Sequence, residues 1–142
     1  MVLLETVAAV QLRNITKRFG NKVVANRSVS LDINHGEILS LLGENGSGKT
    51  TLMNMLAGIY FPDEGEILVN GEPVTIASPK DAFKYGIGMV HQHFKLVDVF
   101  TAAENIVLGL EEHGKLDLAA ASLKIGEICD KYGFQIDPNK KI

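Results

Sequence analysis

The chain has 142 residues, of which 46% are hydrophobic and 22% are charged, and its net charge is −3. This length allows one ordinary domain with a hydrophobic core, and the charge gives no electrostatic reason to expect a nucleic-acid partner. No apolar run reaches the length of a membrane span, and the opening residues lack the basic segment of a secretory signal. The only cysteine, Cys129, cannot form an internal disulfide, which fits a reducing cytosol, and its helical surroundings predict a small buried hydrophobe.

The first part of the chain has the patterns of β-strands. Residues Ala8–Phe19 and Val23–Ile33 alternate apolar and polar side chains, which predicts an antiparallel pair joined by a turn at Gly20–Lys22. A second turn, Asn34–Glu37, leads into a short apolar run that ends at Leu42. We predict that this run, residues 37–42, is a buried strand.

A phosphate-binding motif follows that run directly. Residues 43–50 read GENGSGKT, a complete match to the pattern G-x-x-x-x-G-K-[ST]. Its three glycines allow backbone conformations with positive φ, so that successive N–H groups can surround an anion. Lys49 can reach the β- and γ-phosphates, and Thr50 can bind Mg²⁺. The alternative is a glycine-rich surface turn before a helix. The predicted nucleotide-binding residues of this loop are Gly43, Glu44, Asn45, Gly46, Ser47, Gly48, Lys49, Thr50 and Thr51.

Strands dominate the predicted elements up to about residue 92, and helices dominate afterwards. A helix over Thr51–Leu56 would direct its positive end toward the same phosphates. The later predicted elements, in chain order, are a hairpin over 66–74 around Asn70-Gly71, a helix from Ser78-Pro79 to about Tyr85, a buried strand over Gly86–Gln92, a helix that starts with a capping box at Thr101 and Glu104, and a longer helix over Asp117–Tyr132.

Several classes of nucleotide-binding protein share such a loop. The Asn-Lys-x-Asp motif by which GTPases read guanine is absent, since Asn139-Lys140-Lys141-Ile142 lacks the aspartate. A small nucleoside kinase usually has its phosphate loop near the N-terminus, whereas here two predicted strands precede Gly43. With this N-terminal part, the chain resembles the ATP-binding subunits of ABC transporters. The resemblance implies an α/β fold of the P-loop NTPase class, with an N-terminal antiparallel β region and a P-loop core.

The resemblance also implies roles for two residues outside the loop. An aromatic residue of the first strand region stacks on adenine in this family, and Phe19 takes that position here; the alternative is a core residue beside a turn. A glutamine that ends a buried strand contacts Mg²⁺ and the attacking water, and Gln92 in "GMVHQHF" matches it. With Lys49, Gln92 is therefore a predicted catalytic residue, and it shares the predicted metal site with Thr50. Taken alone, Gln92 would be an ordinary loop residue.

The segments "GENGSGKTTLMNMLAGIYFPDEGEILVNGEPV" and "GIGMVHQHFKL" are most similar to bacterial importers of simple sugars and nucleosides. In this subgroup one long chain often carries two ATP-binding halves. His91 and His93 lie two residues apart and would share one face of a strand. Two imidazoles without a third ligand are weak evidence for a metal, and the resemblance already accounts for them.

Several parts that the family needs for hydrolysis have no match in the sequence. These are an LSGGQ-like signature, a strand that ends in Asp-Glu and a switch histidine. Asp63-Glu64 follows a proline inside a turn, and Glu111-Glu112 lacks an aspartate. All four histidines (His35, His91, His93 and His113) precede the place of the expected strand. We therefore expect an N-terminal fragment, truncated before the signature and the Walker B strand. Its nucleotide-binding core would cover residues 1–96, and the start of a helical subdomain would cover residues 97–142.

The expected function is that of the ATP-binding component of an ABC-type importer of a sugar or nucleoside, with ATP and Mg²⁺ as cofactors. The full-length protein would be an ATPase, whereas this fragment would bind ATP without turning it over. Expected partners are permease subunits, through the loop over Gln92–Val99, and a second ATP-binding half. Without the resemblance, the apolar residues of this loop would instead be expected to be buried between subdomains. The location would be cytoplasmic, on the inner face of the membrane without direct insertion. An autonomous nucleotide-binding module, or an ABC ATPase of DNA repair or translation, is the alternative.

Overall fold

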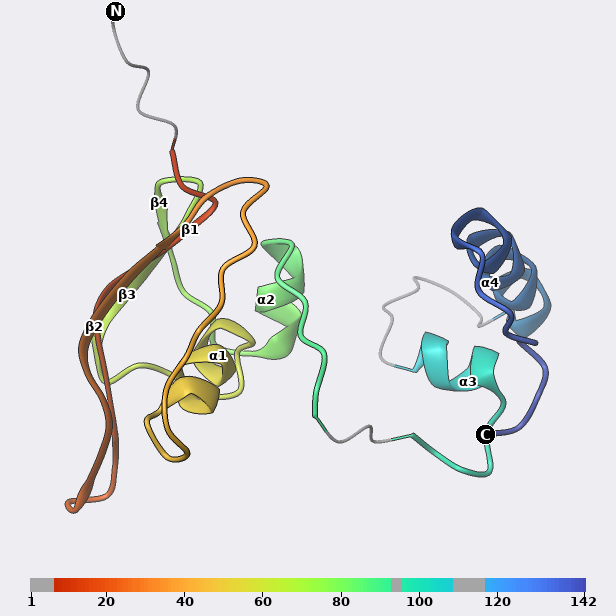
Figure 1. The fold of residues 1–142 in the computed structure, drawn as a ribbon. Helices are drawn as coiled ribbons and strands as arrows, with labels where there is room; N and C mark the ends of the chain where they lie inside the picture. The colour runs from red at the N-terminus through yellow and green to blue at the C-terminus, as the bar shows by residue number, and fades with distance from the viewer. Residues whose placement is uncertain (1–6, 93–95, 109–116) are drawn as a thin grey trace, which may run out of the picture. The chain divides into compact units, whose positions relative to one another are not determined.

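The computed structural model describes residues 7–92, 96–108 and 117–142 (Figure 1). Contacts divide the chain into two compact units, Met1–Val90 and His91–Ile142, which are described separately. The domain boundary between residues 96 and 97 remains a prediction.

The first unit is built on a four-stranded antiparallel sheet with the order β2-β1-β3-β4. Its strands are β1 (Val10–Phe19), β2 (Val23–Ile33), β3 (Glu64–Val69) and β4 (Glu72–Val74). The predicted pairing of the first two strands is confirmed, with Val10 opposite Ile33 and Phe19 opposite Val23. The predicted hairpin at Asn70-Gly71 is also confirmed, since both turn residues have positive φ, as the tightest hairpin turns require.

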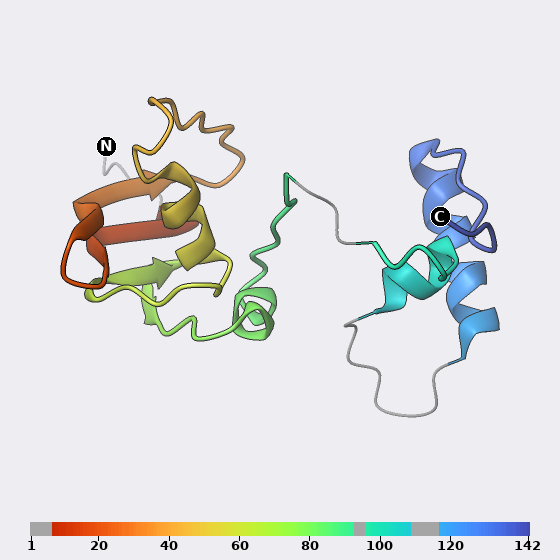
Figure 2. The ribbon, with the colours of Figure 1, turned by 90° about the horizontal axis from the view of Figure 1, so that it is seen from below.

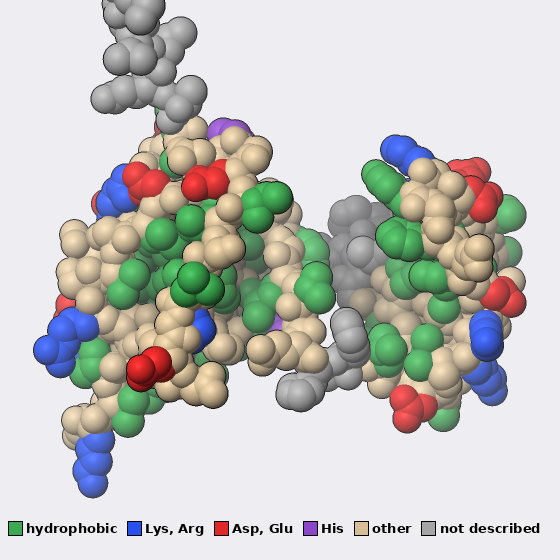
Figure 3. Space-filling model, in the orientation of Figure 1, with side chains coloured by type: hydrophobic (Ala, Val, Ile, Leu, Met, Phe, Trp, Pro, Cys, Tyr) green, Lys and Arg blue, Asp and Glu red, His purple; other side chains and the backbone are tan. Residues whose placement is uncertain are grey.

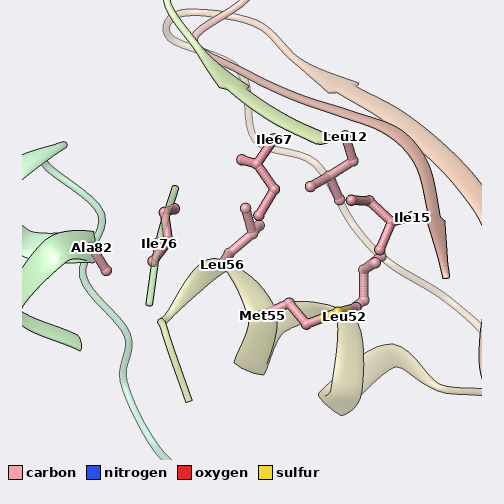
Figure 4. Packing of buried hydrophobic residues seen from close by; sticks show 8 residues of the cluster. All are labelled: Leu12, Ile15, Leu52, Met55, Leu56, Ile67, Ile76 and Ala82. Carbon is pink, nitrogen blue, oxygen red and sulfur yellow. The ribbon is translucent and has the colours of Figure 1, made fainter. Parts of the chain in front are cut away.

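Helix α1 (Lys49–Leu56) packs on one face of this sheet (Figures 1 and 2). Leu52, Met55 and Leu56 are its buried residues, at the i, i+3 and i+4 spacing that places side chains on one face of a helix. They point toward residues of the two central strands, and the resulting cluster (Figure 4) comprises Leu12, Ile15, Leu52, Met55, Leu56, Ile67, Ile76 and Ala82. The apolar stripe of α1 therefore fixes the helix, and with it the loop before the helix, to the sheet.

Helix α2 (Pro79–Lys84) confirms the predicted start at Ser78-Pro79. The Ser78 side chain accepts a hydrogen bond from the backbone N–H of Asp81, and proline occupies the first turn, where a missing N–H costs nothing. Ala82 is buried in the core cluster of the first unit.

The second unit contains helices α3 (Ala102–Val107) and α4 (Leu118–Tyr132). The capping box predicted at Thr101 and Glu104 is present, and Asp117 caps α4. Cys129 is buried, as predicted, against Ala103 and Ile125, which join the two helices into one small core.

Two predicted strands do not form among the residues that the structure describes. Residues 37–42 and 86–92 belong to no sheet, and their apolar side chains include Ile38, Leu42 and Val90, which are 96%, 89% and 85% exposed. Figure 3 shows hydrophobic side chains gathered on one face of the first unit. A strand needs a neighbouring strand to pair its backbone groups, and in the described part of the chain neither segment has one. The predictions were therefore wrong for these residues, because an apolar run indicates burial but does not supply the partner strand.

Candidate functional site

The phosphate-loop motif folds into a loop around its own lysine. The Nζ atom of Lys49 donates hydrogen bonds to the backbone oxygens of Gly43 and Glu44, both at 2.7 Å, and to Oγ of Ser47 at 3.2 Å. The loop is also closed by a hydrogen bond from the N–H of Ser47 to the oxygen of Glu44. The ammonium charge is therefore held at the loop by three oxygen atoms, in a place where it can meet an anion.

The glycines of the loop serve two different purposes. Gly46 and Gly48 have φ values of 85° and 89°, which most side chains avoid. Gly43 does not have positive φ, so the conformational freedom that glycine allows is not used at this position. A Cβ atom at Gly43 would lie 2.8 Å from Oγ of Ser47, so the Ser47 side chain, which accepts a hydrogen bond from Lys49, would have to move.

Helix α1 starts within the motif, at Lys49 rather than at the predicted Thr51. Its N-cap is Gly48, which supplies no side-chain hydrogen bond, and no acidic residue lies in the first turn. The backbone N–H groups at the start of a helix carry partial positive charge and bind anions. Thr50 is exposed on this first turn and Thr51 follows it half-buried. The loop and the helix start thus combine backbone donors, a lysine and a hydroxyl, the groups that would hold a magnesium-bound phosphate.

Asn26 of β2 belongs to this site, although the sequence pattern does not single it out. Its side chain is 6% exposed, and its Nδ2 atom donates a hydrogen bond to the oxygen of Gly48 at 3.3 Å. Its Oδ1 atom is buried and has no hydrogen-bond partner among the described residues. A Cβ atom at Gly48 would lie 2.2 Å from the oxygen of Ala25. Strand β2 therefore touches the start of α1 so closely that only glycine fits.

Phe19, the predicted adenine-stacking residue, lies at the end of β1 and is 39% exposed. Its ring packs edge-to-face on Tyr60, with a distance of 5.2 Å between the ring centroids. Phe19 pairs with Val23 of β2, and the three residues from there to Asn26 span about 10 Å of extended strand. The aromatic ring and the phosphate loop are thus linked by one short piece of β2. Phe19 is not a buried core residue, and its role in stacking remains a prediction.

The carboxylates of Asp63 and Glu64 form ion pairs with the two cationic side chains that precede Phe19 in β1. Asp63 accepts hydrogen bonds from the backbone N–H of Arg18 and from Nζ of Lys17, and these lower the pKa of Asp63 below its usual value. Glu64 accepts from the Arg18 guanidinium at 2.8 Å and opens β3. Both acids therefore have structural partners in the first unit. Glu111, Glu112 and His113 lie outside the described residues.

Gln92 and the segment after it belong to the second unit. Gln92 and His91 are exposed, while His93, Phe94 and Lys95 lie outside the described residues. Leu96 and Val99 are 49% and 70% exposed, and Val97 is tied to Asn105 by two hydrogen bonds. The contact of Gln92 with Mg²⁺ and the role of this loop in partner binding remain predictions.

Over residues 7–92, 96–108 and 117–142, no three His, Cys, Asp or Glu side chains come together as a metal site. In the same ranges, no helix combines the length and the hydropathy that a membrane crossing needs.

Comparison with known proteins agrees with this geometry. A family model described as "ABC transporter" matches residues 26–141. The guanosine import ATP-binding protein NupO of Bacillus subtilis is 52% identical over 134 residues, which are 93% of this chain and 26% of that protein. The nucleoside import ATP-binding protein NupA of Lactococcus lactis is 51% identical over 140 residues, 97% of this chain and 27% of that protein. The chain thus spans about a quarter of the length of these relatives.

A solved structure gives the same result for the fold. The ATP-binding cassette MJ0796, in a dimeric post-hydrolysis state bound to ADP and Pi, superposes with a TM-score of 0.71 and 30% identity over 93% of this chain and 61% of that one. The phosphate-loop motif, the sheet and α1 are those of the P-loop NTPase class. The chain belongs to the ABC transporter family, and its fold is part of an ATP-binding cassette.

Proposed function

We propose that this chain binds Mg-ATP as the nucleotide-binding part of an importer ATPase for a nucleoside or simple sugar. The observation that carries the proposal is the position of Lys49, the first residue of α1, whose Nζ atom donates hydrogen bonds at 2.7 Å to the backbone oxygens of Gly43 and Glu44 in the loop before the helix. A fixed cation beside exposed backbone donors suits a triphosphate better than a neutral ligand. Family membership and the names of the two relatives, which specify guanosine and nucleoside import, support it.

The loop residues have separate roles in this proposal. The backbone of residues 43–48 would surround the β-phosphate, Lys49 would neutralise the β- and γ-phosphates, and the Thr50 hydroxyl would bind Mg²⁺. Phe19 would stack on adenine. Gln92 would contact Mg²⁺ and the attacking water in the assembled enzyme.

The whole protein would couple ATP hydrolysis to transport together with permease subunits and a second ATP-binding half. Its permease contact would be the loop over residues 92–99, and its place the inner face of the cell membrane, with no insertion of its own and no nucleic-acid partner. Selection of the solute would lie with the permease and its binding protein. This chain alone would bind ATP but hydrolyse it at no more than a background rate.

The test is calorimetric titration of the chain with Mg-ATP, before and after Lys49→Ala. Removal of a charge-assisted contact costs on the order of 2–3 kcal/mol, which is about a 30- to 150-fold loss of affinity. Lys124→Ala is the matched control, because it removes an exposed lysine of α4 in the second unit. Circular dichroism establishes that each variant is folded. Equal ATP affinity of the Lys49→Ala variant and the unmodified chain would refute the proposal.

A further inference from the structure

The loop that follows α1 brings an aromatic ring against Phe19. The Phe19 and Tyr60 ring planes meet at 76°, with their centroids 5.2 Å apart. This is the edge-to-face geometry that aromatic pairs prefer, because the positive edge of one ring meets the negative face of the other. Both rings remain partly exposed, at 39% for Phe19 and 36% for Tyr60. The pair is therefore fixed in orientation yet open to solvent.

The backbone around Tyr60 is anchored at both ends. Its N–H donates to the oxygen of Asn54 in α1, and three residues later the N–H of Asp63 donates to the oxygen of Thr16 in β1. The turn between α1 and Tyr60 needs Gly58, where φ is 71° and a Cβ atom would lie 2.2 Å from the oxygen of Ser78. Residues 58–63 thus bridge the end of α1 to β1, which places the Tyr60 ring beside the Phe19 ring.

A cation completes this arrangement. The Nζ atom of Lys17 lies over the Phe19 ring, 5.8 Å from its centroid, and pairs with the Asp63 carboxylate at 3.0 Å. The Lys17 side chain is only 15% exposed, so neighbouring groups cover most of it. A cation over an aromatic face and an edge-on neighbour together restrict the ring more than either would alone. The part of the Phe19 ring that neither Lys17 nor Tyr60 covers remains exposed.

We propose that Tyr60 is a positioning residue for the nucleotide base: its ring holds Phe19 in the orientation in which a purine stacks on it. The proposal rests on the function proposed above, and it extends the base site from β1 to the loop after α1. Stacking requires a flat, correctly turned face, and a ring free to rotate would lose part of its binding energy to ordering. Tyr60 would act through its ring and not through its hydroxyl.

The arrangement also divides the ligand between the two ends of one helix. The N-terminus of α1 carries the phosphate loop, and its C-terminus carries the segment that leads to Tyr60. A change at Tyr60 should therefore weaken the binding of a nucleotide while leaving the binding of a bare polyphosphate intact. A general loosening of α1 would instead weaken the binding of both the nucleotide and the polyphosphate.

The experiment compares Tyr60→Leu, Tyr60→Phe and Phe19→Ala by calorimetry, with Mg-ATP and with inorganic triphosphate. Tyr60→Leu should lower the affinity for ATP about two- to ten-fold, which is the range of the interaction energy of an aromatic pair. It should leave the affinity for inorganic triphosphate unchanged. Tyr60→Phe, which keeps the ring, should retain full ATP affinity. Phe19→Ala should weaken ATP about five- to 30-fold, as loss of a base stack does.

Fluorescence supplies an independent signal. The chain has no tryptophan and three tyrosines, so tyrosine emission is directly observable. A base stacked beside Tyr60 should change that emission, and the change should be smaller in the Tyr60→Phe variant than in the unmodified chain.

The outcomes separate the proposal from the function on which it rests. If Phe19→Ala weakens ATP binding but Tyr60→Leu does not, the role of Tyr60 is refuted, whereas the base site at Phe19 is supported. If neither variant weakens ATP, the base site itself is refuted. Equal weakening of ATP and triphosphate by Tyr60→Leu, or failure of Tyr60→Phe to restore ATP affinity, also overturns the proposal.

Discussion

The Nδ2 atom of Asn26 donates a hydrogen bond to the backbone oxygen of Gly48, 3.3 Å away, and so joins the second strand to the residue before Lys49. The same oxygen accepts the N–H of Leu52 in the first turn of α1 at 2.9 Å. Asn26 is therefore an additional partner for a carbonyl that is already bonded. Its own Oδ1 atom is buried and finds no partner in the described ranges.

This relationship predicts different losses of stability for two substitutions of similar size. Asn26→Asp replaces the donor by a carboxylate that faces the Gly48 oxygen, and a buried group left unpaired costs about 1–3 kcal/mol. Asn26→Leu removes the donor together with the unpaired acceptor, and the Gly48 oxygen keeps Leu52, so the stability should change by less than about 1 kcal/mol. Urea denaturation of the two variants decides; a fully stable Asn26→Asp variant would mean that this contact does not hold the loop.

The close approach of β2 predicts a difference between two glycines of the loop. Gly48→Ala combines positive φ with a Cβ atom 2.2 Å from the oxygen of Ala25, so β2 and α1 would have to separate. Gly46→Ala has a similar φ but no described atom within 4 Å of its Cβ, so only the conformational cost of about 1–2 kcal/mol applies. Denaturation midpoints should thus fall much further for Gly48→Ala. Equal midpoints would contradict the packing of β2 on the loop.

Turnover is expected to be at background level. A phosphate loop binds the ground state and the transition state alike, and this adds little to the rate of hydrolysis. A carboxylate that orients water is what raises the rate. Phosphate release from the chain with Mg-ATP should therefore not exceed that of Lys49→Ala, even at high protein concentration. A rate of about 1 per second that disappears with Lys49→Ala would place a catalytic carboxylate within the chain, with Glu64 and Glu111 to be substituted first.

The Asp63 contacts predict a pH dependence of stability. The N–H of Arg18 and the ammonium group of Lys17 hold the pKa of Asp63 below its usual value near 3.8. Because the folded state binds this proton less readily than the unfolded state, the stabilisation is present above the ordinary pKa and is lost as pH falls through the lower, folded-state value. The difference in unfolding free energy between the unmodified chain and Asp63→Asn should therefore shrink between about pH 5 and pH 2. A constant difference over this range would rule out the linkage.

The proposed contact between residues 92–99 and a permease subunit can be tested by crosslinking in the full-length protein. Val99 is 70% exposed, so a cysteine placed there should form adducts with a permease subunit. Cys129 should first be replaced by alanine, although it is buried, so that the new thiol is the only one in this part of the protein. A cysteine at Lys124 serves as the control. If Val99→Cys gives no permease adduct in any nucleotide state, this loop does not couple the two proteins.

The sequence predicted the features that depend on neighbouring residues. Three such features were confirmed: the hairpin turn at Asn70-Gly71, the cap at Ser78 and the capping box at Thr101. Each depends only on residues within four positions of one another in the sequence. The contacts of Asn26 and Tyr60 were missed, since each joins residues far apart in the chain. The strand expected over 37–42 was wrong because hydrophobicity indicates burial without specifying a partner.

The two unpaired apolar segments affect how the isolated chain behaves in solution. Ile38 and Val90 lie on exposed segments that belong to no sheet of the described residues, and apolar segments whose backbone is not paired in a sheet can pair with another copy. A net charge of −3 provides little repulsion between copies. Added salt would screen even that. Solubility of the isolated chain should therefore fall as ionic strength rises, and dilute, low-salt buffer is the condition in which its nucleotide binding should be measured.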